Sequence, residues 1–336
     1  MSKRALITGV CGQDGAYLSQ LLFEKGYEVF GLDMNTDSQA CWRLNYLDVY
    51  SKVKFIQADM ADGKALLEAV ASSSPAEIYN LAAHSSPGSS FRLPVECGEI
   101  TGLGFVRLLE AAREAAPQAR IFQASTRDLF GAGDGSAYNE GQPFNPANPY
   151  AAAKLYAHWM ARIYRESYGM FICNGIMFNH ESPLRGIEFV TRKITDAVAR
   201  ISLGKESRLA LGNISAKVDW GYAPEYMQAA WRMLQQDAPD DYVVATGQVH
   251  SVEEFARRAF QVAGLKWSEY VESDPALMRP TDIVVQKGDY SRARARLDWE
   301  PRVKFDRLVE IMVKEDLKRW KRHLNGERFP WDVSET

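Results

Sequence analysis

Short apolar segments alternate with helical segments through the first half of the chain. Residues 5–10, 27–33, 53–59, 77–83 and 119–125 read ALITGV, YEVFGLD, VKFIQAD, EIYNLAA and ARIFQAS. Such continuous apolar runs are typical of parallel strands that are covered on both faces. Between them, segments such as 16–26 and 104–115 carry Leu and Ala at helical spacing. The alternation predicts an α/β fold: a Rossmann-like, doubly wound parallel sheet with ligands at the carboxyl ends of its strands.

The pattern becomes irregular after about residue 175, where loops such as NHESPLRGIEF and the proline-containing stretch DPALMRPTD appear. We therefore expect a dinucleotide-binding domain at residues 1–175 and, at residues 176–336, mainly a smaller C-terminal substrate-binding lobe. A later strand or two near residues 213–247, including VVATG, is expected to return to the first sheet.

Composition excludes several classes of protein. The 336 residues are 46% hydrophobic and 25% charged, the balance of an ordinary globular protein. A net charge of -3 provides no positive field for nucleic acid. No apolar stretch approaches the roughly 20 residues that a membrane span needs. We expect a cytoplasmic protein that binds neither nucleic acid nor membrane.

The cysteines, Cys11, Cys41, Cys97 and Cys173, are widely scattered. They form no CxxC motif and no paired Cys/His spacing. We expect reduced packing residues, with no disulfide and no metal site.

Three glycines follow the first predicted strand directly. The segment ITGVCGQDGAYL places Gly9, Gly12 and Gly15 at the start of the next helix. Glycine lets the backbone turn tightly and approach a pyrophosphate, which then sits at the positive helix N-terminus. With the second strand ending at Asp33, about 20 residues on, the pattern predicts a dinucleotide site.

Asp33 favours NAD over NADP. Its carboxylate can accept hydrogen bonds from the adenosine ribose hydroxyls and repels a 2′-phosphate, and residues 34–37 contain no Arg or Lys to hold one. Asp59, at the end of the third strand, is placed to meet the adenine, although a helix N-cap is nearly as good an interpretation.

Tyr150 and Lys154 are the candidate chemical centre. Their spacing in NPYAAAKLYAHW puts both on one helix face, where the ammonium is expected to lower the tyrosine pKa. Such a tyrosine can exchange a proton with a sugar hydroxyl while hydride passes to a nicotinamide. Thr126 would hydrogen-bond the same substrate oxygen. Alone, a Tyr–Lys pair is more often part of an ordinary amphipathic helix; the glycine loop and Thr126 favour the catalytic interpretation.

These residues are similar to those of the extended short-chain dehydrogenases/reductases, which the motifs NLAAHS at residues 80–85 and AST at 124–126 also resemble. More narrowly, NGIMFNHESPLRGIEFVTRKITDAVARI and DWGYAPEYMQAAW closely resemble the GDP-mannose 4,6-dehydratase family, over roughly residues 1–320. That family oxidises a hexose at C4, removes the C5 proton with a carboxylate, expels water from C6 and returns the stored hydride to C6. The resemblance implies a GDP-linked hexose as substrate and a homodimer or homotetramer.

The sequence and the resemblance together give a set of candidate site residues. The expected catalytic residues are Thr126, Asp128, Tyr150 and Lys154. The expected cofactor contacts, for NAD or NADP, are Gly9, Gly12, Gln13, Asp14, Gly15, Asp33, Asp59, Met60, Leu81, Ala82, Ala83, Ser85, Tyr150, Lys154, His180 and Arg185. The expected substrate contacts are Asn179, Val190, Lys193, Arg279 and Asp282.

The chain also departs from the family pattern around the substrate. The family has Thr-Ser-Glu where this chain has Thr126, Arg127 and Asp128, so the carboxylate is one methylene shorter and has a guanidinium beside it. Val218 stands where the family has an arginine that grips the diphosphate. Three hypotheses remain: a 4,6-dehydratase with Asp128 as base; a 4-reductase, C4 epimerase or dehydrogenase that needs no C5 base; and a non-catalytic nucleotide-binding paralogue.

Overall fold

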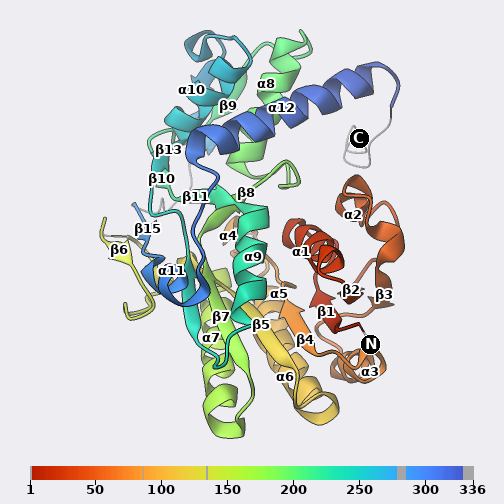
Figure 1. The fold of residues 1–336 in the computed structure, drawn as a ribbon. Coiled ribbons are helices and arrows are strands. Elements are labelled where there is room, and N and C mark those ends of the chain that lie inside the picture. Colours follow the sequence, from red (N-terminus) through yellow and green to blue (C-terminus); the bar gives the residue numbers. More distant parts are fainter. Residues whose placement is uncertain (1, 86, 134, 278–284, 328–336) are drawn as a thin grey trace.

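The computed structural model describes residues 2–85, 87–133, 135–277 and 285–327, and its centre is a seven-stranded sheet (Figure 1). All strand pairs in it are parallel. In spatial order the strands are β12 (Asp241–Val244), β7 (Ile172–Met177), β5 (Arg120–Thr126), β4 (Glu77–Asn80), β1 (Arg4–Thr8), β2 (Glu28–Asp33) and β3 (Lys54–Gln57). The strand order reverses between β1 and β4, which is where ligands bind in sheets of this kind.

Helices cover both faces of the sheet and bury two apolar cores. One core lies under α1 (Gln13–Glu24), α9 (Ala223–Met233) and α11 (Ser291–Leu297), and the other lies under α3 (Gly63–Ser73), α6 (Gly104–Ala115) and α7 (Pro149–Tyr168). Shorter helical segments, α2 (Trp42–Tyr46), α4 (Pro87–Ser90), α5 (Pro94–Cys97) and η2 (Gly98–Leu103), border the carboxyl ends of the strands. The doubly wound α/β architecture predicted from the apolar runs is confirmed.

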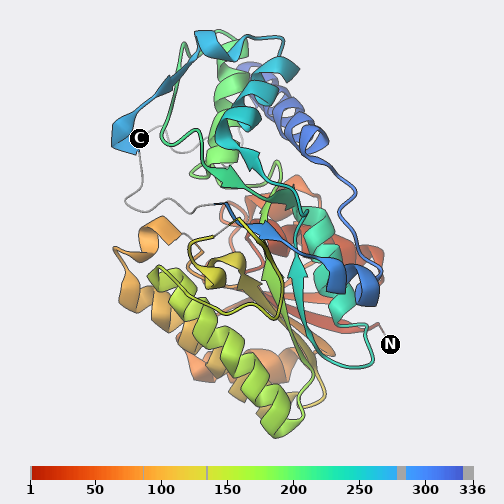
Figure 2. The ribbon, with the colours of Figure 1, turned by 90° about the vertical axis from the view of Figure 1, so that its left-hand side faces the viewer.

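A second lobe lies at one end of the sheet (Figure 2). Its helices are α8 (Val190–Ser202), α10 (Val252–Val262) and α12 (Phe305–Leu324), which pack around a third apolar core. Short paired strands lie beside them: β8 (Asn179–Glu181) with β11 (Trp220–Tyr222), β9 (Leu209–Leu211) with β14 (Val271–Ser273), and β10 (Lys217–Val218) with β13 (His250–Ser251). A fourth pair, β6 (Ala137–Tyr138) with β15 (Lys287–Gly288), lies near α11 beside the main sheet (Figure 1). None of the helices within the described ranges is both long and apolar enough to cross a membrane.

Helix α7 is defined at both ends by the sequence. The Asn148 side chain accepts a hydrogen bond from the Ala151 N–H at 2.8 Å, and Pro149 occupies the first turn, where its missing N–H costs nothing. Gly169, at φ +67°, ends the helix in the left-handed region. The cap therefore fixes Tyr150 in the first turn of the helix.

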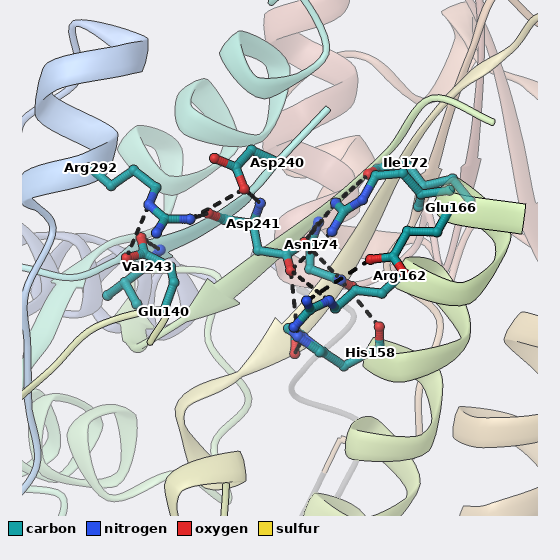
Figure 3. Close-up of polar contacts among 12 residues, drawn as sticks. Glu140, His158, Arg162, Glu166, Ile172, Asn174, Asp240, Asp241, Val243 and Arg292 are labelled. Atoms are coloured by element: carbon teal, nitrogen blue, oxygen red, sulfur yellow. Dashed lines mark hydrogen bonds and ion pairs between the residues drawn. The ribbon is translucent and has the colours of Figure 1, made fainter. Parts of the chain in front are cut away.

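A buried polar cluster fastens α7 to β7 and β12 (Figure 3). The Asp241 carboxylate accepts hydrogen bonds from Arg165 at 2.9 Å and from the Asn174 side chain at 3.0 Å. His158 lies 3.7 Å from the same carboxylate, and burial lowers the pKa of its imidazole to about 4. At neutral pH the Asp241 carboxylate is therefore paired with Arg165, and with Arg162 at 4.0 Å, beside a neutral histidine.

Cys11 and Cys41 form a disulfide, with their Cα atoms 4.5 Å apart. The prediction that these two cysteines are reduced was wrong. Because β1 and β2 are parallel neighbours, the turn after β1 and the segment after β2 lie side by side, although the cysteines are 30 residues apart. Cys97 and Cys173 are free and buried.

Candidate active site

The glycine loop after β1 makes a close backbone turn into α1. Gly9 has φ +70°, and a Cβ there would lie 2.8 Å from the Ala82 nitrogen. A Cβ on Gly15 would lie 2.5 Å from the Val10 carbonyl oxygen. Both positions therefore require glycine, one for the turn beside β4 and one for the packing of α1 on β1.

Asp33, at the end of β2, faces this loop with its carboxylate held in place. Oδ2 accepts a hydrogen bond from the Cys11 N–H at 3.1 Å, and Oδ1 accepts one from the Met34 N–H at 2.9 Å. Burial raises the pKa of Asp33, and these backbone hydrogen bonds act against that rise. The carboxylate thus lies beside the loop in a defined orientation.

A cavity of about 920 Å³ runs along the carboxyl ends of β1, β2 and β4. Asp59 lines it and accepts a hydrogen bond from the Ala61 N–H, while the N-cap of α3 is Asp62. The alternative that Asp59 caps the helix is therefore wrong. The expected cofactor residues that line this cavity are Gly9, Gly12, Asp33, Asp59, Met60, Leu81, Ala82, Ala83 and Ser85.

A second cavity, of about 320 Å³, continues from the first. The two share Leu81, Ala83 and Ser85 as lining residues. All the residues expected to be catalytic line it: Thr126, Asp128, Tyr150 and Lys154. Other expected residues that line it are Asp14, Asn179, His180, Arg185 and Val190. The fold therefore brings together side chains from β5, α7, β8 and α8 next to the first cavity.

Tyr150 and Lys154 are both buried in the second cavity, 9% and 3% exposed. Burial, and then the charge of Asp128, raise the pKa of Tyr150, while the Thr126 hydroxyl acts in the opposite direction. The Lys154 ammonium donates a hydrogen bond to the Ala124 carbonyl at 2.7 Å and lies 5.8 Å from the centre of the Tyr150 ring. The predicted lowering of the Tyr150 pKa by Lys154 is therefore wrong for the chain alone, because burial and the nearby carboxylate dominate.

The arrangement is that of a known family. A family model described as GDP-mannose 4,6 dehydratase matches residues 6–312. GDP-mannose 4,6 dehydratase 1 of Arabidopsis thaliana is 45% identical over 330 residues, which are 95% of this chain and 91% of that protein. The human GDP-mannose 4,6 dehydratase is 40% identical, over 96% of this chain and 93% of that protein. The chain belongs to the GDP-mannose 4,6-dehydratase family.

The resemblance predicted from the sequence is thereby confirmed, and the chain is an enzyme of the extended short-chain dehydrogenase/reductase superfamily. Solved structures agree on the fold. A UDP-glucose 4-epimerase of Thermus thermophilus in complex with NAD has a TM-score of 0.82 at 25% identity, over 93% of this chain and 98% of that one. A dTDP-glucose 4,6-dehydratase of Bacillus anthracis in complex with NAD also has a TM-score of 0.82, at 19% identity, over 96% of this chain and 100% of that one.

Three of the expected residues that the structure describes are not among those that line these two cavities: Gln13, Gly15 and Lys193. Gln13 instead ties the glycine loop to β8 and its following turn, because it donates to the His180 carbonyl at 3.2 Å and accepts from the Ser182 hydroxyl at 2.7 Å. The Lys193 ammonium donates to the Ala210 carbonyl at 2.8 Å. Gly15 supports the packing of α1. Two further expected residues, Arg279 and Asp282, lie outside the described residues.

His180 and Asp14 form an ion pair, with Nε2 and Oδ2 2.8 Å apart. Although burial opposes the charged imidazole, the Asp14 carboxylate raises the pKa of His180. Burial likewise opposes the carboxylate, yet His180 lowers the pKa of Asp14. The pair joins the start of α1 to β8 and so connects the cofactor loop to the second lobe.

Two side chains at this dehydratase-family site were missed by the sequence reasoning. Glu181 is 2% exposed, and its carboxylate accepts from the Thr191 hydroxyl at 2.6 Å and lies 3.3 Å from Nε of Arg185. Gln286 is 1% exposed and accepts a hydrogen bond from Arg127. Glu181 directly follows Asn179 and His180, a signal that could have identified it; Gln286 has no such local signal.

Proposed function

We propose that this chain is a 4,6-dehydratase that acts on GDP-mannose or a closely related nucleotide-linked hexose. In this reaction C4 is oxidised, the C5 proton and the C6 hydroxyl leave together as water, and the hydride returns to C6 as a proton returns to C5. The observation that carries the proposal is the convergence of Thr126, Asp128, Tyr150 and Lys154 in one cavity that continues from the dinucleotide cavity. The dehydratase relatives, at 40–45% identity, support the same reaction.

The first cavity fits a dinucleotide cofactor. Gly9 and Gly15 allow a close backbone turn, and the N-terminus of α1 points its unpaired N–H groups toward that turn. A bound nicotinamide would supply the acceptor and donor of the hydride. We propose NAD as the cofactor, because the oriented carboxylate of Asp33 favours ribose hydroxyls and repels a 2′-phosphate. Fluorescence titration should show tighter binding of NADH than of NADPH; the reverse order contradicts this proposal.

The chain's own residues have distinct proposed roles. Tyr150 takes the proton of the C4 hydroxyl, and Thr126 hydrogen-bonds the same oxygen. The pKa of Lys154 is lowered to about 8, mainly by burial, so its ammonium can also release a proton near neutral pH. Asp128 is 5% exposed, and its Oδ1 has no hydrogen-bond partner within the described ranges. We assign removal of the C5 proton to this carboxylate, because a carboxylate oxygen that accepts no hydrogen bond is the better base.

The substrate is proposed to bind between the sheet and the second lobe. We assign residues 1–175 mainly to the cofactor and residues 176–336 mainly to the substrate, with Asn179 and Val190 at the shared cavity. Lys193, whose ammonium contacts a carbonyl of β9, and the residues outside the described ranges keep their substrate roles as predictions. Titration calorimetry with GDP-mannose, GDP and UDP-glucose tests the choice of nucleotide.

We also propose a homodimer or homotetramer. Tyr156, Trp159 and Ile163 lie on one side of α7 and are 43%, 45% and 46% exposed. An exposed apolar row of this kind is typical of an interface between subunits. Light scattering coupled to size exclusion should give a mass of two or four chains, whereas a single-chain mass contradicts the assembly. The cytoplasmic location stays a prediction, which cell fractionation tests.

Mass spectrometry tests the reaction itself. Incubation with GDP-mannose and NAD should yield a nucleotide sugar that has lost one water. Replacing Asp128 by Asn should abolish that loss yet spare hydride exchange at C4, and replacing Tyr150 by Phe should stop both. Equal loss of both partial reactions in Asp128→Asn contradicts the role of Asp128.

One observation favours a second candidate function. The Arg127 guanidinium lies 3.5 Å from Oδ1 of Asp128, and a cation so close weakens a carboxylate as a base. The alternative is therefore a 4-reductase or C4 epimerase, which needs Thr126, Tyr150 and Lys154 alone. Consumption of a 4-keto-6-deoxy nucleotide sugar with NADH, without any dehydrated product from GDP-mannose, selects this alternative. The non-catalytic paralogue is selected if nucleotide binds but neither reaction occurs.

A further inference from the structure

Arg127 joins three segments of the chain inside the second cavity. Its side chain is 12% exposed. Nε donates to Oδ1 of Asn179 in β8 at 2.6 Å, and Nη1 donates to Oε1 of Gln286, which directly precedes β15, at 2.6 Å. Nη2 lies 3.5 Å from Oδ1 of Asp128. The guanidinium is thus nearly surrounded by protein and cannot turn freely toward solvent.

The two amides hold the guanidinium away from the carboxylate. A close Arg–carboxylate pair has N–O distances of about 2.7–2.9 Å and is commonly bidentate. Here the short contacts go to neutral amides, and the contact with Asp128 is too long to be a hydrogen bond. Oδ1 of Asp128 therefore accepts no hydrogen bond from the residues that the structure describes, while the positive charge 3.5 Å away offsets the cost of burying it.

The same contacts settle which end of each amide faces Arg127. A guanidinium only donates hydrogen bonds, so the oxygen of Asn179 must face it. This leaves the Asn179 NH2 group as the donor available to the cavity that Asn179 lines. Gln286 uses its own NH2 group on the Gly131 carbonyl, so both of its ends are fixed.

We propose that Arg127 is a positioning residue for the dehydration and that Gln286 sets its position. Gln286 holds the Arg127 guanidinium in place. The guanidinium binds the oxygen of Asn179, so that the Asn179 NH2 group can donate a hydrogen bond to the substrate. It also stays beyond hydrogen-bond distance of the Asp128 carboxylate, which takes the C5 proton. The proposal rests on the proposed function, because it assigns the base of that reaction.

Replacing Gln286 by Leu removes the acceptor of Nη1 and lets the guanidinium turn toward Asp128. We expect removal of the C5 proton to slow by about 10–100-fold, since a small displacement of a reacting group has that effect. Oxidation at C4 should change by less than about threefold, because Tyr150 and Lys154 are not touched. Exchange of the C5 proton with heavy water, followed by mass spectrometry, measures the first step, and single-turnover formation of NADH measures the second.

The double variant Arg127→Met/Gln286→Leu shows whether Gln286 acts through Arg127. If it does, Gln286→Leu slows C5 exchange in the natural chain but changes it by less than about twofold in the Arg127→Met background. Equal slowing in both backgrounds overturns the proposal. Circular dichroism shows whether each variant is folded.

Arg127→Met alone keeps the proposal testable if Gln286→Leu does not fold. Affinity for GDP-mannose, measured by calorimetry, should fall about tenfold, because Asn179 is no longer oriented. C5 exchange at saturating substrate should not fall, because a carboxylate without a cation beside it is the stronger base. Collapse of C5 exchange with unchanged affinity overturns the proposal. If the unaltered protein shows neither C4 oxidation nor C5 exchange, the proposed function itself is contradicted, and the role of Arg127 in dehydration is contradicted with it.

Discussion

The chain keeps a lysine inside its active site at a cost in stability. Lys154 is 3% exposed, and its ammonium donates a hydrogen bond to the Ala124 carbonyl at 2.7 Å. Burial lowers its pKa from 10.5 to about 8. Between these two values the unfolded chain binds more protons than the folded chain, so this group makes stability rise with pH. Above about pH 10.5 the burial of Lys154 has no electrostatic cost, and as the pH falls through about 8 the free energy of unfolding reaches its full loss.

The size of the effect follows from the two pKa values of Lys154. At pH 7 the folded chain holds Lys154 as a charged ammonium, and its burial costs about 3 kcal/mol. At pH 9.5 the folded lysine is neutral while the unfolded one is still charged, and the cost is about 1 kcal/mol. Replacing Lys154 by Met removes this cost but also removes the hydrogen bond to the Ala124 carbonyl, which keeps only the longer one from the Gln123 side chain at 3.4 Å; the loss costs about 1 kcal/mol at either pH. We therefore expect Lys154→Met to stabilise the cofactor-free protein by about 2 kcal/mol at pH 7 and hardly at all at pH 9.5, while it abolishes turnover.

Urea unfolding at the two pH values, followed by tryptophan fluorescence, measures the difference between the variant and the natural protein. Comparison at each pH removes the contribution of all other titrating groups. Lys64→Met is the matched control, because the Lys64 side chain is 86% exposed and its replacement should have the same small effect at both pH values. A stability difference for Lys154→Met that is the same at pH 7 and pH 9.5 would refute the reasoning.

Three further substitutions test the fold. Cys41→Ser removes a disulfide whose ends are 30 residues apart, which should lower the free energy of unfolding by about 3–4 kcal/mol in urea under oxidising conditions; equal stability would show that the thiols are not joined. Asp241→Ala leaves Arg165 without its carboxylate partner and should cost about 3–5 kcal/mol, seen as a lower Tm. Phe255→Ala opens a cavity in the core of the second lobe and should cost about 3–5 kcal/mol by denaturant midpoint, whereas Val95→Ala, at a position that is 83% exposed, should cost almost nothing.

The local pattern of the chain was sufficient for much of the fold. Each apolar run of the first half forms a strand of the parallel sheet, because such runs can be buried only between two layers of helices. The tight turn predicted at the glycine loop is present, with Gly9 at φ +70°, whereas its approach to a pyrophosphate stays a prediction. Both results depend on residues that are adjacent or one helical turn apart, which the sequence displays directly.

The electrostatics of the site could not be obtained in the same way. The spacing of Tyr150 and Lys154 correctly places both in one cavity, but it suggested the wrong direction for the Tyr150 pKa. Burial and the charge of Asp128 decide that pKa, and both depend on what the rest of the chain packs around the phenol. The disulfide between Cys11 and Cys41 was missed for a related reason, since only the pairing of β1 with β2 brings the two segments together.

The sequence by itself determined the alternation of strands and helices, the glycine turn and the residue types at the chemical centre. Tertiary structure alone decided what surrounds Arg127, the odd residue beside the expected base. Its partner Gln286 is 159 residues away and carries no motif. A hydrogen bond of that kind depends on how two segments pack, and no spacing along the chain encodes it. Packing therefore decided that Oδ1 of Asp128 lies 3.5 Å from Arg127 and accepts no hydrogen bond from the described part of the chain, which the sequence had left open.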